Sequence, residues 1–317
     1  MIVSYKPNRS RRSFFRNALA SVAGSAFLPG QLFAGETKVL AKPRQLRIVQ
    51  ITDSHVIDEK SSKHTKRMLE KITKEEKPDM ILHTGDVIMD SFKANKQETA
   101  DQWKVWKDII SDVNTPIHYC IGNHDIWWSS ECVGDPLHGI QWVLKELNLP
   151  GRYYSFTQNG WHFIFLDSTR PDDKGGYTGG IDEEQMRWLN EELQRVPKIL
   201  PVLIMSHIPL LSTSIFDWSK CEEAVWKVSG GLMHADSHII QSLLRKHPNV
   251  KACISGHLHL QDNISYDNIQ YMGCGAVSGN WWEDSVFHQT RSGYAVIDLT
   301  NKGEIRREYK VFDWKVQ

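Results

Sequence analysis

The feature that most constrains this chain is a set of five short segments in which metal-binding side chains directly follow an apolar run. In order they are Asp53-Ser54-His55, Gly85-Asp86, Gly122-Asn123-His124-Asp125, Ser206-His207 and Gly256-His257-Leu258-His259. A single Asp-x-His would mean little, because two such residues meet by chance in many sequences. Five clusters, each placed after a strand-like run, are hard to explain by chance, and together they supply enough ligands for two adjacent metal ions.

Apolar, β-favouring runs alternate with amphipathic segments along the chain. Strands are predicted at 46–52, 80–83, 117–121, 161–166, 201–205, 250–254, 269–272 and 294–299. Helices are predicted at 63–76, 99–113, 137–147, 182–195 and 236–246, with Asp182 and Asp236 as N-caps. The alternation predicts an α/β architecture, and the strands after His259 predict an antiparallel return.

The ligand clusters all occupy the position where sites form in open α/β sheets, beyond the carboxyl ends of strands. Ordinary polar loop starts would not require His, Asp and Asn at these places. Because no repeat or Pro/Ser-rich linker divides the chain, residues 35–317 are predicted to form a single domain.

The donor set mixes carboxylate oxygen, amide oxygen and imidazole nitrogen, without thiolate. This mixture suits Mn, Fe or Zn better than a cysteine-rich structural zinc or an all-oxygen calcium site. Two cations held close together need an anionic ligand between them, since their repulsion is otherwise uncompensated. Asp86 is the natural bridge.

The order of the motifs, D-x-H, G-D, G-N-H-D, H and G-H-x-H, resembles that of the calcineurin-like metallophosphoesterase superfamily. The resemblance spans Asp53 to His259 and implies a four-layer α/β/β/α sandwich of two mixed β-sheets flanked by helices. It implies one metal on Asp53, His55 and His259, a second on Asn123, His207 and His257, and Asp86 on both.

The expected chemistry is hydrolysis of a phosphate ester by a metal-bridging hydroxide. His124 is the candidate general acid for the leaving group, because it adjoins the ligand Asn123 without being assigned to a metal. Asp125 is predicted to hold the His124 imidazole in the correct tautomer.

Within the superfamily the motifs look most like the bacterial cyclic-nucleotide-phosphodiesterase-like branch, which favours a phosphodiester substrate. Purple acid phosphatases usually show Asp-x-Gly and a ligating Tyr at the positions occupied here by His55 and Met89, so that subgroup is disfavoured. A phosphomonoesterase on the same scaffold, a hydrolase of other esters and a non-catalytic exported binding protein stay open as alternatives.

Bulky rings and two cationic side chains are the candidate substrate contacts. They are Trp127, Trp128, His234, Trp281, Trp282 and Arg291. Loop aromatic rings near a cleft can grip a substrate ring, but the same tryptophans could simply cap the core. The remaining histidines, including His64, His83, His118, His138, His162 and His247, are interpreted as structural or surface residues.

The N-terminal segment is basic and free of acidic residues. Ser10-Arg11-Arg12-Ser13-Phe14, followed by a weakly apolar run from Ala18 to Leu28, resembles a twin-arginine export signal. Residues 1–34 are therefore predicted to engage the twin-arginine export machinery and to direct the protein to the periplasm or another extracytoplasmic site. A disordered basic tail and an uncleaved membrane anchor are the alternatives.

The charge and cysteine content exclude other classes. After residue 34 the chain carries 33 basic against 38 acidic side chains, which disfavours nucleic acid as the main partner. The five cysteines form no C-x-x-C pair, so a zinc ribbon or thiol redox site has little support. Cys120 and Cys253 are predicted to be buried, and a Cys132–Cys221 disulfide is left open.

Overall fold

The structure is a computed structural model that describes residues 46–129, 134–172 and 175–312. The predicted export signal and Cys132 lie outside the described residues, so the signal, the domain boundary at residue 34 and the Cys132–Cys221 pairing stay predictions. Cys120 and Cys253 are buried, as predicted, and Cys221 is exposed.

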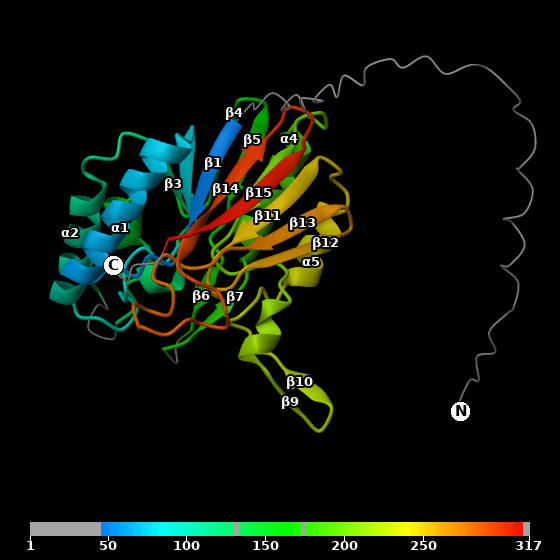
Figure 1. The fold of residues 1–317 in the computed structure, drawn as a ribbon. Coiled ribbons are helices and arrows are strands. Elements are labelled where there is room, and N and C mark those ends of the chain that lie inside the picture. Colours follow the sequence, from blue (N-terminus) through cyan, green and yellow to red (C-terminus); the bar gives the residue numbers. More distant parts are fainter. Residues whose placement is uncertain (1–45, 130–133, 173–174, 313–317) are drawn as a thin grey trace, which may run out of the picture. The chain divides into compact units, whose positions relative to one another are not determined.

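Two mixed β-sheets form the centre of the described chain (Figure 1). The first has five strands in the order β15-β14-β1-β2-β3. Its strands are β1 Leu46–Ile51, β2 Met80–His83, β3 Ile117–Tyr119, β14 Gly293–Leu299 and β15 Ile305–Val311. Strands β1, β2 and β3 are parallel, whereas β14 is antiparallel to both β1 and β15, which confirms the predicted antiparallel return.

The second sheet has six strands in the order β12-β13-β11-β8-β5-β4. Its strands are β4 Tyr154–Gln158, β5 Trp161–Phe165, β8 Val202–Met205, β11 Val250–Ser255, β12 Asp262–Tyr266 and β13 Ile269–Gly273. The four inner strands are parallel and the two edge strands are antiparallel to their neighbours. Two small ribbons are added by β6 Thr169–Pro171 with β7 Tyr177–Gly179, and by β9 Lys220–Glu222 with β10 Val225–Lys227.

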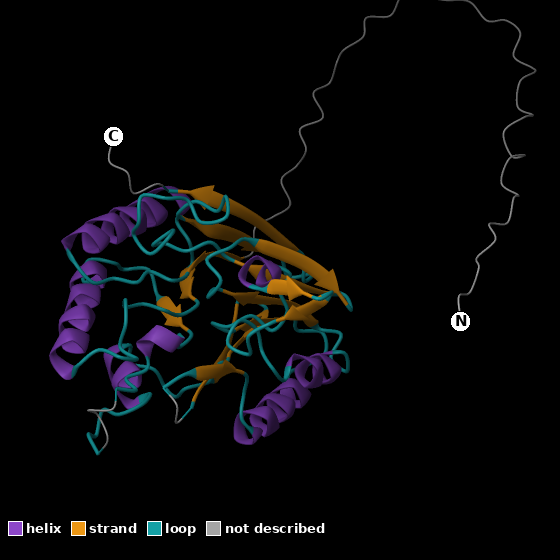
Figure 2. Ribbon diagram, turned by 90° about the horizontal axis from the view of Figure 1, so that it is seen from below, coloured by secondary structure: helices purple, strands orange, loops and turns teal. Residues whose placement is uncertain are grey.

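Helices cover the outer face of each sheet, and Figure 2 shows the strands lying between them. The helices are α1 Glu59–Lys71, α2 Lys96–Ile110, α3 Gln141–Glu146, α4 Glu183–Arg195 and α5 Ser237–Leu244, with the short turns η1 Ile72–Glu76, η2 Asn123–Asp125 and η4 Ser214–Trp218. Side chains of α1, α2 and α3 share a buried cluster with the five-stranded sheet, and those of α4 and α5 share one with the six-stranded sheet. None of the helices described has the length and apolar character needed to cross a bilayer.

A third buried cluster lies between the two sheets. It joins Leu46 and Leu82 of the first sheet to Phe163, Met205 and Ile254 of the second. Each sheet therefore buries both faces, which is why the inner strands are nearly continuous apolar runs without alternation. The four-layer α/β/β/α sandwich is confirmed.

One of the two predicted helix caps is wrong. The Asp182 carboxylate accepts a hydrogen bond from the Gln185 amide at 2.8 Å and caps α4 as predicted. Asp236 makes no side-chain cap on α5. Its carboxylate instead accepts from the Ile181 amide at 2.9 Å and lies 3.1 Å from His234 Nδ1, so it ties two loops together.

The buried His64 should make the stability of the fold sensitive to acid. Its imidazole packs on the rings of Trp282 and Phe312, and burial lowers its pKa to about 3. The unfolded chain takes up this proton near pH 6.5 and the folded chain does not, so the free energy of unfolding falls as the pH drops below about 6.5. Between about pH 6.5 and 5, we expect the free energy of unfolding of His64→Phe to fall by about 2 kcal/mol less than that of the wild type. Urea unfolding at both pH values tests this, and an unchanged pH dependence in the variant would contradict it.

Candidate metal centre

All five ligand segments meet at one edge of the sandwich. Each follows the carboxyl end of a strand, namely β1, β2, β3, β8 or β11, and parallel strands present these ends at the same edge of a sheet. Of the seven predicted metal ligands, six are buried and only His257 is partly exposed. Buried carboxylates and imidazoles are costly unless they bind something, so the position itself indicates a ligand.

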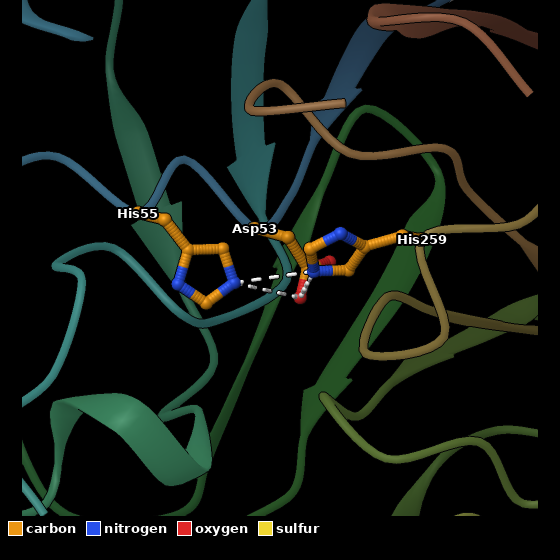
Figure 3. A group of neighbouring side chains, drawn as sticks. All are labelled: Asp53, His55 and His259. Carbon is orange, nitrogen blue, oxygen red and sulfur yellow. Dashed lines mark hydrogen bonds and ion pairs between the residues drawn. The ribbon is translucent and has the colours of Figure 1, made fainter. Parts of the chain in front are cut away.

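The first group consists of Asp53, His55 and His259 (Figure 3). The Nε2 atoms of His55 and His259 lie 3.2 Å apart, and Asp53 Oδ1 lies 3.3 Å from His259 Nε2 and 3.9 Å from His55 Nε2. Asp53 Oδ1 is buried and has no hydrogen-bond partner among the residues that the structure describes. Two imidazole nitrogens and an unpaired carboxylate oxygen converging on one point fit a borderline cation.

The second group contains Asp86, His207 and His257, with Asn123 beside them. His207 Nε2 lies 3.1 Å from Asp86 Oδ2, 3.0 Å from Asn123 Oδ1 and 3.2 Å from His257 Nδ1. Asp86 Oδ2 is also 3.8 Å from His55 Nε2 of the first group. The Asp86 carboxylate therefore lies between the two groups, where a bridging ligand would have to be.

Backbone carbonyls fix the tautomers of three of these histidines. The contacts are His207 Nδ1 to Thr84 O at 2.8 Å, His257 Nε2 to Gly231 O at 2.9 Å and His259 Nδ1 to Gly279 O at 2.9 Å. A carbonyl only accepts, so each of these nitrogens carries a proton, and the opposite nitrogen, which a metal ion could bind, faces the centre. The sequence gives no sign of these three carbonyls, since any residue could supply them.

The protonation of the imidazoles follows from burial and the two carboxylates. Burial lowers the pKa of His55 and of His257 to about 3, which keeps both rings neutral. Burial also acts to lower the pKa of His207, but the adjacent Asp86 carboxylate reverses this effect and raises it to about 9. A cation bound between these groups would replace that proton, because metal ligands must be deprotonated.

Five of the seven predicted ligands have left-handed backbone conformations. Their φ angles are 51° for Asp53, 42° for His55, 55° for Asp86, 73° for His257 and 57° for His259. Such angles are uncommon outside glycine and cluster at functional sites, where the surrounding structure must enforce them. In two short loops these backbone angles turn a pair of candidate ligands toward the centre, Asp53 with His55 in one and His257 with His259 in the other.

The glycines of the motifs are required by close packing. A Cβ at Gly122 would lie 2.1 Å from both the backbone nitrogen and Oδ1 of Asp86, and one at Gly256 would lie 1.9 Å from Thr52 Oγ1. Any side chain at either position must therefore displace a ligand loop.

Gly122→Ala should accordingly disturb the centre although it removes no ligand. Because the added methyl group must displace Asp86, we expect metal affinity to fall by at least about tenfold. Titration of the apoprotein with Mn or Zn measures this. Gly151→Ala is the matched control, since a Cβ there lies 3.4 Å from its nearest neighbour, Tyr153 O. Equal metal affinity in the two variants would contradict the steric argument.

His124 lies beside the first group and contacts it. Its ring meets that of His55 edge to face at 4.9 Å, and its backbone amide donates to Asp86 Oδ1 at 2.8 Å. Its Nδ1 is buried, accepts or donates no hydrogen bond within the described part of the chain, and lies 3.9 Å from Asp90 Oδ1. Asp90 is thus the carboxylate that faces this imidazole, and sequence reasoning missed it.

The predicted role of Asp125 in orienting His124 is wrong. The Asp125 carboxylate accepts hydrogen bonds from four backbone amides, those of Asp86, Val87, Ile88 and Gly122, at 2.8–3.3 Å. These bonds use both oxygens. Asp125 therefore joins the Gly-Asp loop to the Asn-His-Asp loop and does not hold the imidazole.

In each tryptophan pair one ring is buried and the other is half-buried. Trp127 is 1% exposed and donates from Nε1 to Ala94 O, and Trp282 is 7% exposed and donates from Nε1 to His55 O. Burial removes both rings from substrate contact, which corrects the prediction for them. Trp128 stacks on His138, whereas Trp281 stacks on the candidate ligand His259 with ring centroids 4.0 Å apart.

The other candidate contacts have mixed positions. His234 is buried, with Nδ1 3.1 Å from Asp236 Oδ1, so no exposed ring is available for a substrate phosphate. Arg291 is exposed, and its contact with substrate stays a prediction. His83 accepts from the Gly85 amide and lies 2.8 Å from Ser54 Oγ, which agrees with its structural interpretation.

Comparison with known proteins agrees with this geometry. The family model described as calcineurin-like phosphoesterase matches residues 46–261. The chain is 25% identical over 279 residues to the 3′,5′-cyclic adenosine monophosphate phosphodiesterase CpdA of Haemophilus influenzae, with 84% of this chain and 89% of the relative covered. It is 24% identical over 238 residues to a probable glycerophosphodiester phosphodiesterase, GpdQ, of Arcobacter nitrofigilis, with 70% and 75% covered.

A solved structure shows the same fold. The crystal structure of a dimetal phosphatase from Danio rerio superposes with a TM-score of 0.60 at 16% identity, covering 84% of this chain and 96% of that one. The family match covers more than half of the sequence and contains every candidate ligand. This chain is therefore a member of the calcineurin-like phosphoesterase family.

Proposed function

We propose that this protein is a metal-dependent hydrolase of phosphate esters that holds two metal ions and favours phosphodiesters. The observation that carries the proposal is the position of the Asp86 carboxylate, which reaches His207 of one ligand group and His55 of the other. The family membership and the two phosphodiesterase relatives support the same function.

The residues fit the metal ions that the family implies. Asp53, His55 and His259 would hold one ion, Asn123, His207 and His257 the other, and Asp86 both. Metal ions bound there would lower the pKa of a water molecule and neutralise charge on the phosphoryl oxygens. The donor chemistry favours Mn, Fe or Zn, and the occupancy and identity of the ions are part of the proposal.

The chain's own residues would supply the proton transfer. His124 adjoins the first ligand group, and its ring is partly open to solvent, with 32% of the side chain exposed. A neutral leaving group requires a proton on its oxygen, and an imidazole at this edge can donate one. Asp90 Oδ1 lies 3.9 Å from Nδ1 and would help to orient this ring.

A substrate panel tests the proposal. The purified protein, loaded in turn with Mn, Fe and Zn, is assayed on a phosphomonoester, an acyclic phosphodiester, a cyclic nucleotide and a carboxylic ester. We expect turnover of diesters to exceed turnover of the monoester, and chelation to abolish both. Faster hydrolysis of the monoester would establish the phosphomonoesterase alternative, and no turnover of any ester would favour a binding protein.

We also propose that the protein is exported. The support is the Ser10-Arg11-Arg12 pattern with its following apolar run, and an exported enzyme would act on extracytoplasmic phosphate compounds. The double substitution Arg11→Lys/Arg12→Lys should shift the protein from the periplasm to the cytoplasm. Fractionation of cells that express the wild type or the double variant measures this distribution. An unchanged distribution in the double variant would contradict export by this route.

A further inference from the structure

Exposed apolar side chains gather on one short segment near the metal centre. Between residues 216 and 228 the exposed fractions are 44% for Phe216, 37% for Trp218, 56% for Val225, 49% for Trp226 and 39% for Val228. All residues of β9 and β10 are exposed, and Figure 1 shows their hairpin extending away from the two sheets. We call residues 216–228 the apolar arm. Apolar groups gathered on one exposed element mark an interaction surface.

Aromatic contacts connect the apolar arm to the metal centre. Trp281 stacks on the His259 ring, and Trp218 meets Trp281 at 5.9 Å between ring centroids with an interplanar angle of 84°. Trp218 Nε1 also donates to the carbonyl of Leu258, the residue before His259. Two residues earlier in η4, Phe216 packs against Trp226 of the hairpin at 4.9 Å. These rings form a row in two contacting parts, His259 with Trp281 and Trp218, and Phe216 with Trp226. The backbone of η4 joins the two parts, so the row extends from a candidate metal ligand to the hairpin.

The inner end of this row is fixed by the backbone. Trp281 and Trp282 have φ angles of 47° and 67°, which is uncommon for bulky residues. The conformation is enforced by hydrogen bonds from Trp282 Nε1 to His55 O and from Lys60 Nζ to Trp282 O. Strain enforced from several sides points to a function for the ring that it places, and that ring is Trp281.

We propose that the apolar arm enters the interfacial layer of a zwitterionic lipid surface and brings lipid phosphodiesters to the metal centre. This inference rests on the proposed phosphodiesterase function and specifies its substrate class. Tryptophan and phenylalanine suit such a surface because their rings lie between the acyl chains and the head groups. The hairpin carries Lys220 and Lys227 against Glu222 and Glu223, a balance that favours head groups without net charge.

The length of the row favours a lipid over a nucleoside. A single nucleobase beside the centre would be covered by Trp281 and Trp218, and it would leave Trp226 and Val225 without a role. Acyl chains packed around the hairpin would cover those residues as well. The row thus matches a substrate that is apolar well beyond its phosphate.

Vesicle flotation tests the arm. The full-length protein is mixed with dioleoylphosphatidylcholine vesicles, and the vesicle-bound fraction is compared with that of a Val225→Ser/Trp226→Ser variant. Both side chains would be buried in the lipid on binding, so their loss should weaken partitioning into the vesicles by at least about tenfold. Ile199→Ser is the matched control, because Ile199 is 92% exposed and precedes the amino end of β8, at the opposite end of that strand from His207. We expect the control to bind like the wild type.

A kinetic comparison separates this inference from the proposed function. The ratio of kcat/KM for phosphatidylcholine vesicles to that for bis(p-nitrophenyl) phosphate should fall about tenfold in the double variant. The proposed lipid contact of the apolar arm would be overturned if the wild-type protein does not float with the vesicles, or if the double variant floats equally well. If the wild type is a dimer that does not bind vesicles and the double variant is a monomer, the arm is a contact between copies of the chain. That result would also overturn the proposed lipid contact. If vesicle binding depends on the arm but neither diester is hydrolysed, the lipid contact is supported and the phosphodiesterase function is rejected.

Discussion

Replacing Asp86 with asparagine should remove metal from both ligand groups and lower kcat/KM for a phosphodiester by at least about 10³-fold. Asparagine keeps the size of the side chain and one acceptor oxygen for the His124 amide, but it loses the negative charge. That charge lies 3.1 Å from His207 Nε2 and 3.8 Å from His55 Nε2. Without it, the repulsion between two cations is uncompensated.

Metal content and kinetics should be measured on the same preparation. Asp112→Asn provides the same substitution on a side chain that is 76% exposed and pairs with Lys66, and it should retain metal and activity. Full metal content in Asp86→Asn would show that this carboxylate does not link the two groups.

Replacing His124 with glutamine should leave the metal content unchanged and reduce turnover, because the ring lies beside the first ligand group without belonging to either proposed ligand set. Loss of a general acid lowers the rate by about 10²–10⁴-fold when the leaving group needs a proton. The loss should be much smaller for a p-nitrophenyl ester, whose leaving group departs as a stable anion. The readout is the ratio of kcat for alkyl and p-nitrophenyl diesters.

A control for His124 distinguishes proton donation from simple disturbance. His138→Gln makes the same change in a ring that packs on Trp128 and should leave the ratio unchanged. An equal loss of kcat for both leaving groups in His124→Gln would remove this residue from proton transfer.

The sequence predicted the ligand positions because they depend on a simple rule of topology. Parallel strands bring their carboxyl ends to one edge of a sheet, so the clusters after β1 and β2 had to meet in the first sheet, and those after β8 and β11 in the second, once these strands were parallel. Packing of the two sheets on one another then brings the two sets together. The inner strands were also predictable, since strands buried on both faces are continuous apolar runs. The fold class and the meeting of the ligands follow from these two facts.

Three of the four edge strands of the two large sheets, β4, β12 and β15, could not be predicted in the same way. β15 reads Ile-Arg-Arg-Glu-Tyr-Lys-Val, and β12 begins with Asp262 and Asn263, so both resemble polar loops. Charged side chains on edge strands prevent pairing with other chains, which conflicts with the apolar signal of a strand. Helix α1 begins at Glu59, earlier than predicted, because Asp58 and Ser61 form a capping box without the usual Glu or Gln.

The parts of the site that escaped prediction are those in which long-range packing decides. Asp125 follows His124 in the sequence, yet its carboxylate turns to the Gly-Asp loop, while the distant Asp90 faces the imidazole. Adjacent tryptophans such as Trp281 and Trp282 point to different environments, one on the ligand His259 and the other into the core. Neighbours in sequence do not share surroundings at strained turns, and only the structure assigns them.

Anomalous diffraction from crystals grown with Mn would show whether two ions bind at these side chains, because it locates the metal without reference to activity. We expect two separate peaks, one coordinated by Asp53, His55 and His259 and the other by Asn123, His207 and His257, with an Asp86 oxygen reaching both. Peaks elsewhere in the molecule, or none at these side chains in fully loaded crystals, would contradict this expectation.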